Sequence, residues 1–131
     1  MNKIFYLIIP ILIVVSSCKK EVTQDLTPYK LDYGNFPPPN LPDDNALTKE
    51  KVKLGKMLFH EKLMSSDGTI SCASCHLNTN AFNDDKRFSE GVGGLLGDRN
   101  AMSIVNMAWN TNGFFWDGRA HLLRDQSLGP I

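Results

Sequence analysis

The 131-residue sequence has few cysteines and no surplus of charge of either sign. Its three cysteines are not the evenly spread, even-numbered set of a disulfide framework. Fourteen basic residues balance fourteen acidic ones, which argues against a nucleic-acid binder that needs clustered Lys and Arg. The longest apolar run, Ile4 to Val15, is interrupted by Pro10 and is shorter than the roughly 20 residues of a transmembrane helix. The sequence also lacks the two-residue alternation of a half-buried strand.

The first residues have the pattern of a secretory signal: Lys3, a short apolar stretch, then small residues. Val15-Ser16-Ser17-Cys18 resembles the bacterial lipoprotein cleavage box, in which the exposed cysteine is acylated. We therefore expect residues 1–17 to be a lipoprotein signal peptide and Cys18 to carry lipid. The mature chain would be anchored to a membrane in the cell envelope or periplasm. The alternative is an ordinary signal peptide with an incidental cysteine.

Residues 18–44 form a Pro-rich tether in this interpretation, because Pro37, Pro38 and Pro39 favour an extended spacer. Residues 45–131 are the expected folded part. Apolar spacing and capping residues predict helices over about 48–61, 72–77, 100–109 and 119–128, with a loop over 78–98. The predicted fold class is all-α with long loops. Such loops in a small domain indicate that something other than side chains fills its centre.

The strongest chemical signal is the C-x-x-C-H string from Cys72 to His76. Two cysteines three residues apart lie on the same side of a helix, where both thiols can reach the vinyl groups of one porphyrin. His76 follows directly and can ligate the haem iron. A structural zinc site is weaker, because it needs four ligands and the sequence has no second ligand pair. A thioredoxin-like redox pair is also weaker, because no βαβ context surrounds it.

From Thr48 onward the chain resembles the N-terminal haem domain of bacterial di-haem cytochrome c peroxidases and their MauG-like relatives. C-x-x-C-H is common to all c-type cytochromes, and the string from Phe115 to Arg119 is far more specific. Gln126 and the pair Gly129-Pro130 also match, in the family's order. The strings that carry the resemblance are Leu54–Phe59, Asp67–His76, Gly97–Ala101 with Ser103 close behind, and Phe115–Ala120.

The resemblance implies a cytochrome c-like haem domain that binds peroxide, with Cys72 and Cys75 holding haem c and His76 ligating its iron. It also implies a second haem c in a C-terminal domain. Trp116 matches a tryptophan that relays electrons between the haems. Asn100 matches a residue that helps to bind calcium between the domains, and Gln126 matches a glutamine beside the peroxide pocket.

Several of these residues have simpler alternative roles. Trp116 can be a core aromatic, and Asn100 can cap a helix. Arg119 can pair with Asp117 or meet a haem propionate, which needs a cation. Surface or packing roles are expected for His60 and His121, and core packing for Met102 and Met107.

Two departures from the family pattern bear on function. Val92 stands where classical members carry a distal histidine, so we expect an open sixth iron position, as in the MauG-like branch. The chain also stops at Ile131, before the family's catalytic glutamate, so we expect it to be a fragment that is nearly inactive alone.

The expected function of the full-length protein is haem-dependent reduction of hydrogen peroxide with electrons from a small redox protein. Two alternatives remain open. One is a mono-haem electron carrier, with Met102 or Met107 as the sixth ligand. The other is a MauG-like oxidase that acts on a protein side chain.

Overall fold

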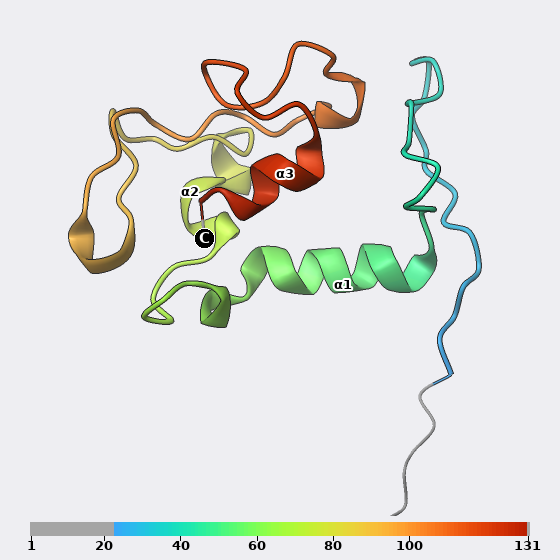
Figure 1. The fold of residues 1–131 in the computed structure, drawn as a ribbon, viewed down its shortest axis with the longest axis horizontal. Coiled ribbons are helices and arrows are strands. Elements are labelled where there is room, and N and C mark those ends of the chain that lie inside the picture. Colours follow the sequence, from blue (N-terminus) through green and yellow to red (C-terminus); the bar gives the residue numbers. More distant parts are fainter. Residues whose placement is uncertain (1–22, 131) are drawn as a thin grey trace, which may run out of the picture.

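The computed structural model describes residues 23–130, so the predicted signal peptide over 1–17 and the predicted lipidation site Cys18 lie outside the described residues. Within these described residues there are three α-helices: α1 (Lys49–His60), α2 (Cys72–Cys75) and α3 (Leu123–Leu128). Figure 1 shows them joined by extended connecting segments. Four single-turn 3-10 helices interrupt these segments: η1 (Lys62–Met64), η2 (Asn78–Asn80), η3 (Val92–Gly94) and η4 (Met107–Trp109). Residues 23–130 contain no β-strand, which confirms the all-α expectation.

Helix α1 begins where its capping residue predicts. The Thr48 hydroxyl accepts a hydrogen bond from the Lys51 amide at 3.3 Å, and Glu50 lies in the first turn, where the helix dipole favours an acid. The apolar side of α1 is largely uncovered, since Leu54 and Met57 are 54% and 62% exposed. None of the helices in the described part of the chain is long and apolar enough to cross a membrane.

The helix predicted over residues 100–109 is wrong, because only η4 is helical there. A helix would require the Val105 amide to donate to the Ala101 carbonyl. Instead that carbonyl accepts from the Asp84 amide at 3.4 Å, and the Val105 amide donates to the Ser103 hydroxyl at 3.4 Å. The Ala101 amide donates to the Ser89 hydroxyl at 2.8 Å. Partners distant in sequence have therefore overridden the local helical pattern.

Two other predicted helices are shorter than expected. The helix placed over 119–128 begins only at Leu123, because Ala120 is paired with Phe114 in an antiparallel bridge. The helix placed over 72–77 ends at Cys75, because the backbone of His76 leaves the helical region at φ −103°, ψ 78°.

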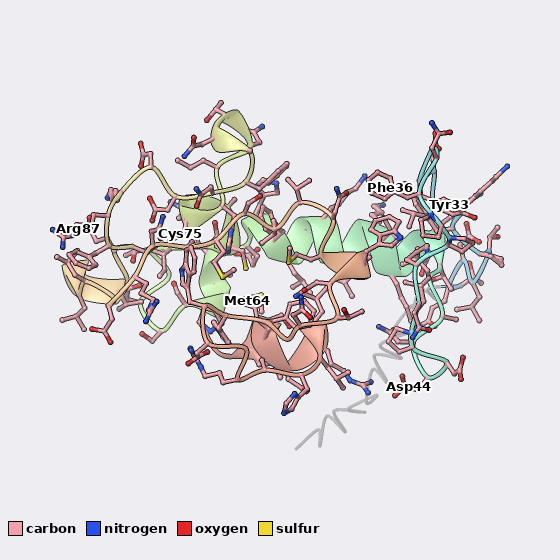
Figure 2. The ribbon with its side chains drawn as sticks, turned by 90° about the horizontal axis from the view of Figure 1, so that it is seen from above. Tyr33, Phe36, Asp44, Met64, Cys75 and Arg87 are labelled. Carbon is pink, nitrogen blue, oxygen red and sulfur yellow. The ribbon has the colours of Figure 1, made fainter. Side chains whose placement is uncertain are left out.

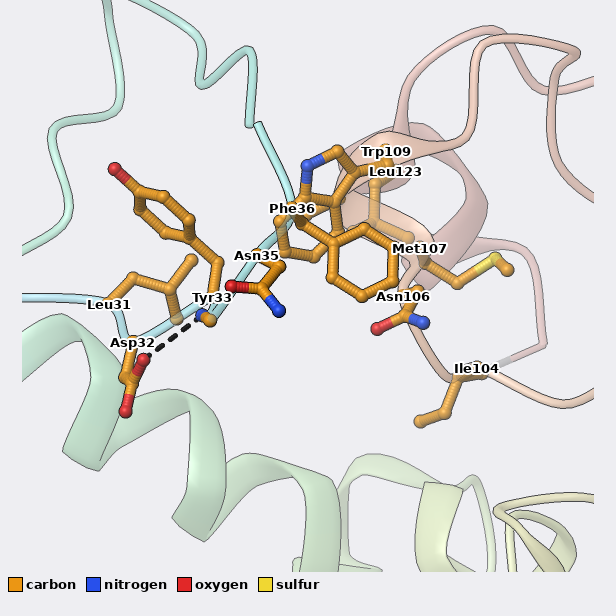
Figure 3. Close-up of a pocket in the computed structure, with 12 residues that line it drawn as sticks. Leu31, Asp32, Tyr33, Asn35, Phe36, Ile104, Asn106, Met107, Trp109 and Leu123 are labelled. Atoms are coloured by element: carbon orange, nitrogen blue, oxygen red, sulfur yellow. Dashed lines mark hydrogen bonds between the residues drawn. The ribbon is translucent and has the colours of Figure 1, made fainter. Parts of the chain in front are cut away.

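The described part of the Pro-rich segment contacts the rest of the chain at several points. Pro28 and Thr48 form an antiparallel bridge beside the start of α1. The Trp109 indole nitrogen donates to the Pro37 carbonyl at 2.8 Å, and the Phe36 and Trp109 ring centroids lie 5.4 Å apart. Figure 3 shows these two rings side by side in a cavity of about 680 Å³ between the segment and residues near η4.

Residues 23–130 bury few side chains completely. Phe114, at 8% exposed, is the one buried hydrophobic side chain among them, and Asp84, at 6%, is the most buried polar one. Figure 2 shows Arg87 at one end of the molecule, Tyr33, Phe36 and Asp44 towards the other end, and Cys75 and Met64 between them. Since so few apolar side chains are buried, the loops depend heavily on hydrogen-bonded turns.

Candidate functional site

Helix α2 holds both cysteines of the C-x-x-C-H string as free thiols, each half-buried. Ser71 and Ser74 form a reciprocal capping box at its start, and the Ser71 amide donates to the Ser74 hydroxyl at 3.0 Å. The single turn between Cys72 and Cys75 places them on one side of the helix. Burial raises the pKa of the Cys75 thiol, and the nearby Asp84 carboxylate adds to that effect. The shift favours the neutral thiol form of Cys75 in this short, capped helix.

His76 follows α2 with its imidazole held in one orientation. Its Nδ1 lies 3.1 Å from the Phe82 carbonyl oxygen. Because a carbonyl oxygen can only accept, Nδ1 carries the proton in this bond, and the lone pair is on Nε2. The Phe59 ring of α1 packs nearby, with its centroid 6.4 Å from the rings of both His76 and Phe82. His76 thus presents the nitrogen that a metal ligand needs.

The donor set at α2 fits a covalently attached haem c. Two neighbouring thiols would provide the two covalent attachment points, and an imidazole with a free Nε2 lone pair would provide an iron ligand. Among residues 23–130, no group of three or more His, Cys, Asp or Glu side chains is arranged to hold a metal ion. The site therefore lacks the ligand set of a structural zinc centre, for which four N or S donors are typical.

The buried Asp84 and its partner Ser89 form a polar cluster near Cys75. Asp84 accepts from the Ser89 hydroxyl at 2.6 Å and from the Lys86 amide at 2.9 Å. Burial alone would raise the pKa of Asp84, but these hydrogen bonds outweigh it and hold the pKa below the ordinary 3.8. Ser89 also accepts from the Ala101 amide. Asp84 and Ser89 therefore join the segment that follows α2 to the segment that precedes Ser103.

The string from Phe115 to Arg119 forms a tight turn closed by the bridge between Phe114 and Ala120. Gly113 has φ +81°, and a Cβ there would lie 2.5 Å from the Gly118 carbonyl oxygen, so no other residue fits. Phe115 itself adopts φ +65°. The Arg119 guanidinium lies 3.7 Å from the Phe115 ring centroid.

Arg119 is paired with Asp117 in this turn. Its Nη1 donates to both carboxylate oxygens of Asp117, at 2.9 and 3.0 Å. The backbone amide of Arg119 and its guanidinium hold the pKa of Asp117 below its usual range. Of the alternatives for Arg119, the structure contains the pair with Asp117.

Trp116 and Asn100 are brought together by the fold. The Trp116 indole nitrogen donates to the Asn100 backbone carbonyl at 3.0 Å, and the Trp116 side chain is 53% exposed. Trp116 is therefore an anchored surface aromatic and not a core residue. The Asn100 backbone is not helical, so it does not cap a helix.

The remaining candidates lie on other elements. Gln126 is half-buried on α3, and the end of that helix approaches Phe115 closely, since a Cβ on Gly129 would lie 2.9 Å from Phe115 Cζ. Val92 begins η3, in a loop that projects from the body in Figure 1. Met102 is half-buried, and Met107 lines the cavity beside Trp109. His60 and His121 are exposed, as expected.

Sequence reasoning missed Phe82 and Asp84. The orienting group of Phe82 is a backbone carbonyl, which has no side-chain signature, and its left-handed conformation is unusual for a bulky residue. Asp84 could have been noticed, because an Asp whose carboxylate accepts from the amide two residues later is a common turn signal.

The chain is similar to several characterised proteins. The profile of the family described as di-haem cytochrome c peroxidase matches residues 49–131. Cytochrome c peroxidase Ccp of Escherichia coli is 40% identical over 99 residues, which cover 76% of this chain and 21% of that protein. Methylamine utilization protein MauG of Methylorubrum extorquens is 38% identical over 108 residues, 82% of this chain and 30% of that one.

A solved structure also resembles this one. The crystal structure of a MauG-like protein associated with microbial copper homeostasis matches with a TM-score of 0.72 and 38% identity, over 79% of this chain and 30% of that chain. The chain thus spans between a fifth and a third of the length of the relatives described here.

Proposed function

Since the chain belongs to the di-haem cytochrome c peroxidase family, we propose that residues 45–131 are the N-terminal, peroxide-binding haem c domain of a periplasmic peroxidase. The observation that carries the proposal is the arrangement at α2: two adjacent free thiols followed by an imidazole whose Nδ1 is bound to the Phe82 carbonyl. The full-length enzyme reduces hydrogen peroxide with electrons from a small redox protein, and a second domain supplies a second haem c.

We assign a separate role to each residue of this site. Cys72 and Cys75 would hold haem c covalently through their two thiols, one for each vinyl group. His76 would be the residue that ligates the iron, through the Nε2 lone pair. When bound, haem c supplies the redox-active iron at which peroxide is reduced. Val92, which begins η3, has no side-chain group that ligates iron, so this position would leave the iron open to peroxide.

Trp116 and Gln126 have separate roles in our proposal, one in electron transfer and the other in peroxide binding. The anchored, half-exposed indole of Trp116 supports a role in passing electrons in from the second domain. The Gln126 amide, half-buried on α3, is proposed to hydrogen-bond bound peroxide.

Further proposals concern ions and location. Asn100 would contribute to a calcium site through its side chain, since its carbonyl already accepts from Trp116. Arg119 would reach a haem propionate only by sharing its guanidinium with Asp117. Cys18 would carry a lipid anchor after removal of residues 1–17, with residues 18–44 as the tether.

The mono-haem carrier is less favoured than the peroxidase. Such a carrier needs a sixth iron ligand. One of the two candidate methionines, Met107, instead lines the cavity with Phe36 and Trp109. A low-spin spectrum with a sulfur–iron band would nevertheless favour the carrier over our proposal. High-spin ferric bands are the expected result.

The experiment is expression in the periplasm of a host that attaches haem c. We expect covalent haem in a denaturing gel, and its loss in the double variant Cys72→Ala/Cys75→Ala. Peroxide consumption is then measured with a reduced donor, for this chain and for the same domain joined to its second haem domain. Absence of covalent haem from the unaltered chain would refute the proposal. Haem attachment without peroxide turnover in the two-domain protein would leave only an electron carrier or a MauG-like oxidase.

A further inference from the structure

The orientation of His76 depends on a turn with an unusual backbone. Ala81 and Phe82 adopt φ +51° and +56°, the left-handed region that residues with a Cβ seldom occupy. The Phe82 carbonyl that binds His76 Nδ1 belongs to this pair. If the two residues relaxed to ordinary conformations, the carbonyl would turn away from the imidazole. Something must therefore hold the turn in place.

Part of the restraint is local. The Phe82 amide donates to the Leu77 carbonyl at 2.8 Å, and the Asn83 amide donates to the Asn80 carbonyl at 3.0 Å. Leu77 and Asn83 also form an antiparallel bridge. These bonds close the loop over residues 77–83, but they fix the amide side of the Ala81–Phe82 peptide and leave its carbonyl side free.

Ser103 holds the carbonyl side from 22 residues away. Its hydroxyl donates to the Ala81 carbonyl at 2.7 Å. Among the hydrogen bonds of residues 23–130, this is the one that joins the 77–83 turn to a residue outside the segment 76–83. The same hydroxyl lies within 3.4 Å of the Val105 amide, which can donate to it, so its rotor is oriented by the backbone that follows it.

We propose that Ser103 is a positioning residue for His76: by binding the Ala81 carbonyl, it locks the left-handed turn that aims the Phe82 carbonyl at Nδ1. A carbonyl bound to Nδ1–H fixes the tautomer and makes Nε2 a stronger donor to a metal. Ser103 therefore sets the strength of the axial ligand without contacting it. The inference rests on the proposed attachment of haem at α2.

The test compares Ser103→Ala, Ser103→Thr and Ser127→Ala in the haem-loaded protein. Ser127→Ala is a matched control, because its hydroxyl donates to the Arg124 carbonyl at 2.8 Å within α3. The readouts are the iron–histidine stretching frequency of the reduced protein, by resonance Raman, and the reduction midpoint potential. Thermal unfolding shows whether each variant is folded.

For Ser103→Ala we expect a lower iron–histidine frequency and a higher midpoint potential, because a weaker donor stabilises the ferric state less. Ser103→Thr keeps the hydroxyl and should have the iron–histidine frequency and midpoint potential of the unaltered protein. Ser127→Ala should change neither quantity. A folded Ser103→Ala protein with unaltered frequency and potential would overturn the inference. A shift of equal size in Ser127→Ala would also overturn it. Failure of the unaltered protein to attach haem would instead refute the proposed function.

If Ser103→Ala does not fold, Phe82→Gly gives a second measurement. Glycine adopts φ +56° without strain, so the double variant Ser103→Ala/Phe82→Gly should keep the turn and recover a frequency close to that of Phe82→Gly alone. A double variant that remains shifted from Phe82→Gly would show that Ser103 does not act through the turn.

Discussion

Asp84 is the most buried carboxylate in the described part of the chain, and its removal should destabilise the protein strongly. It is 6% exposed and accepts two hydrogen bonds, from the Ser89 hydroxyl at 2.6 Å and the Lys86 amide at 2.9 Å. Hydrogen bonds to charged groups contribute roughly 1.5–3 kcal/mol each. Asp84→Ala removes both bonds and should therefore lower the free energy of unfolding by about 3–6 kcal/mol, a large fraction of the roughly 5–15 kcal/mol typical of a domain.

The assay is urea unfolding of the haem-loaded protein, followed by far-ultraviolet circular dichroism. Asp25→Ala is the matched control, because Asp25 accepts from the Thr27 amide at 2.9 Å in an exposed turn outside the 45–131 region. The control should change stability by less than about 0.5 kcal/mol. Equal effects of the two substitutions would refute the argument from burial.

The pH dependence provides a second check on Asp84. Its pKa in the folded chain lies below the ordinary 3.8, so the unfolded state binds a proton first as the pH falls. The stabilisation is complete above the unfolded value and is lost as the pH falls through the folded value. The stability difference between the unaltered protein and Asp84→Asn should therefore narrow from about pH 5 to about pH 3. A constant difference over that range would contradict the assigned charge.

Three further substitutions test other parts of the structure. Cys75→Ala should leave haem attached through Cys72 alone, with a pyridine haemochrome band shifted towards that of a haem with one free vinyl group; complete loss of covalent haem would contradict independent attachment. Trp109→Phe removes the hydrogen bond to the Pro37 carbonyl, worth about 0.5–1.5 kcal/mol, and should speed limited proteolysis within residues 31–44 about two- to twelve-fold. An unchanged cleavage rate would show that this bond does not hold the segment. Gly113→Ala forces a Cβ to within 2.5 Å of the Gly118 carbonyl at φ +81°, and thermal unfolding should show a loss of about 2 kcal/mol or more; a loss under about 0.5 kcal/mol would mean that the turn rearranges easily.

Elements with local signals were predicted well. The Thr48 hydroxyl, Glu50 and the apolar spacing that follows specify α1, because capping and periodicity act within a few residues. The spacing of Cys72 and Cys75 predicted their placement on one short helix in the same way, since one helical turn fixes their relative positions. The sequence motifs likewise identified the family whose profile matches residues 49–131.

Elements held by distant partners were not predicted. Residues 100–106 have a helical pattern, yet their backbone groups are bound to Asp84, Ser89 and Trp116. Helix α3 begins at Leu123 and not at the predicted Arg119 for the same reason, because Ala120 pairs with Phe114. Periodicity cannot report such partners, which become neighbours only when the chain is folded.

By itself, then, the sequence determined which residues we propose to carry the chemistry, because thiols, an imidazole and their spacing are local properties of the chain. Only the tertiary structure decided how that chemistry is aimed. His76 Nδ1 meets the Phe82 carbonyl, and the Ser103 hydroxyl binds the Ala81 carbonyl of the same left-handed turn, 22 residues away in the sequence. Every residue has such a carbonyl, so its direction is set by folding and not by residue type.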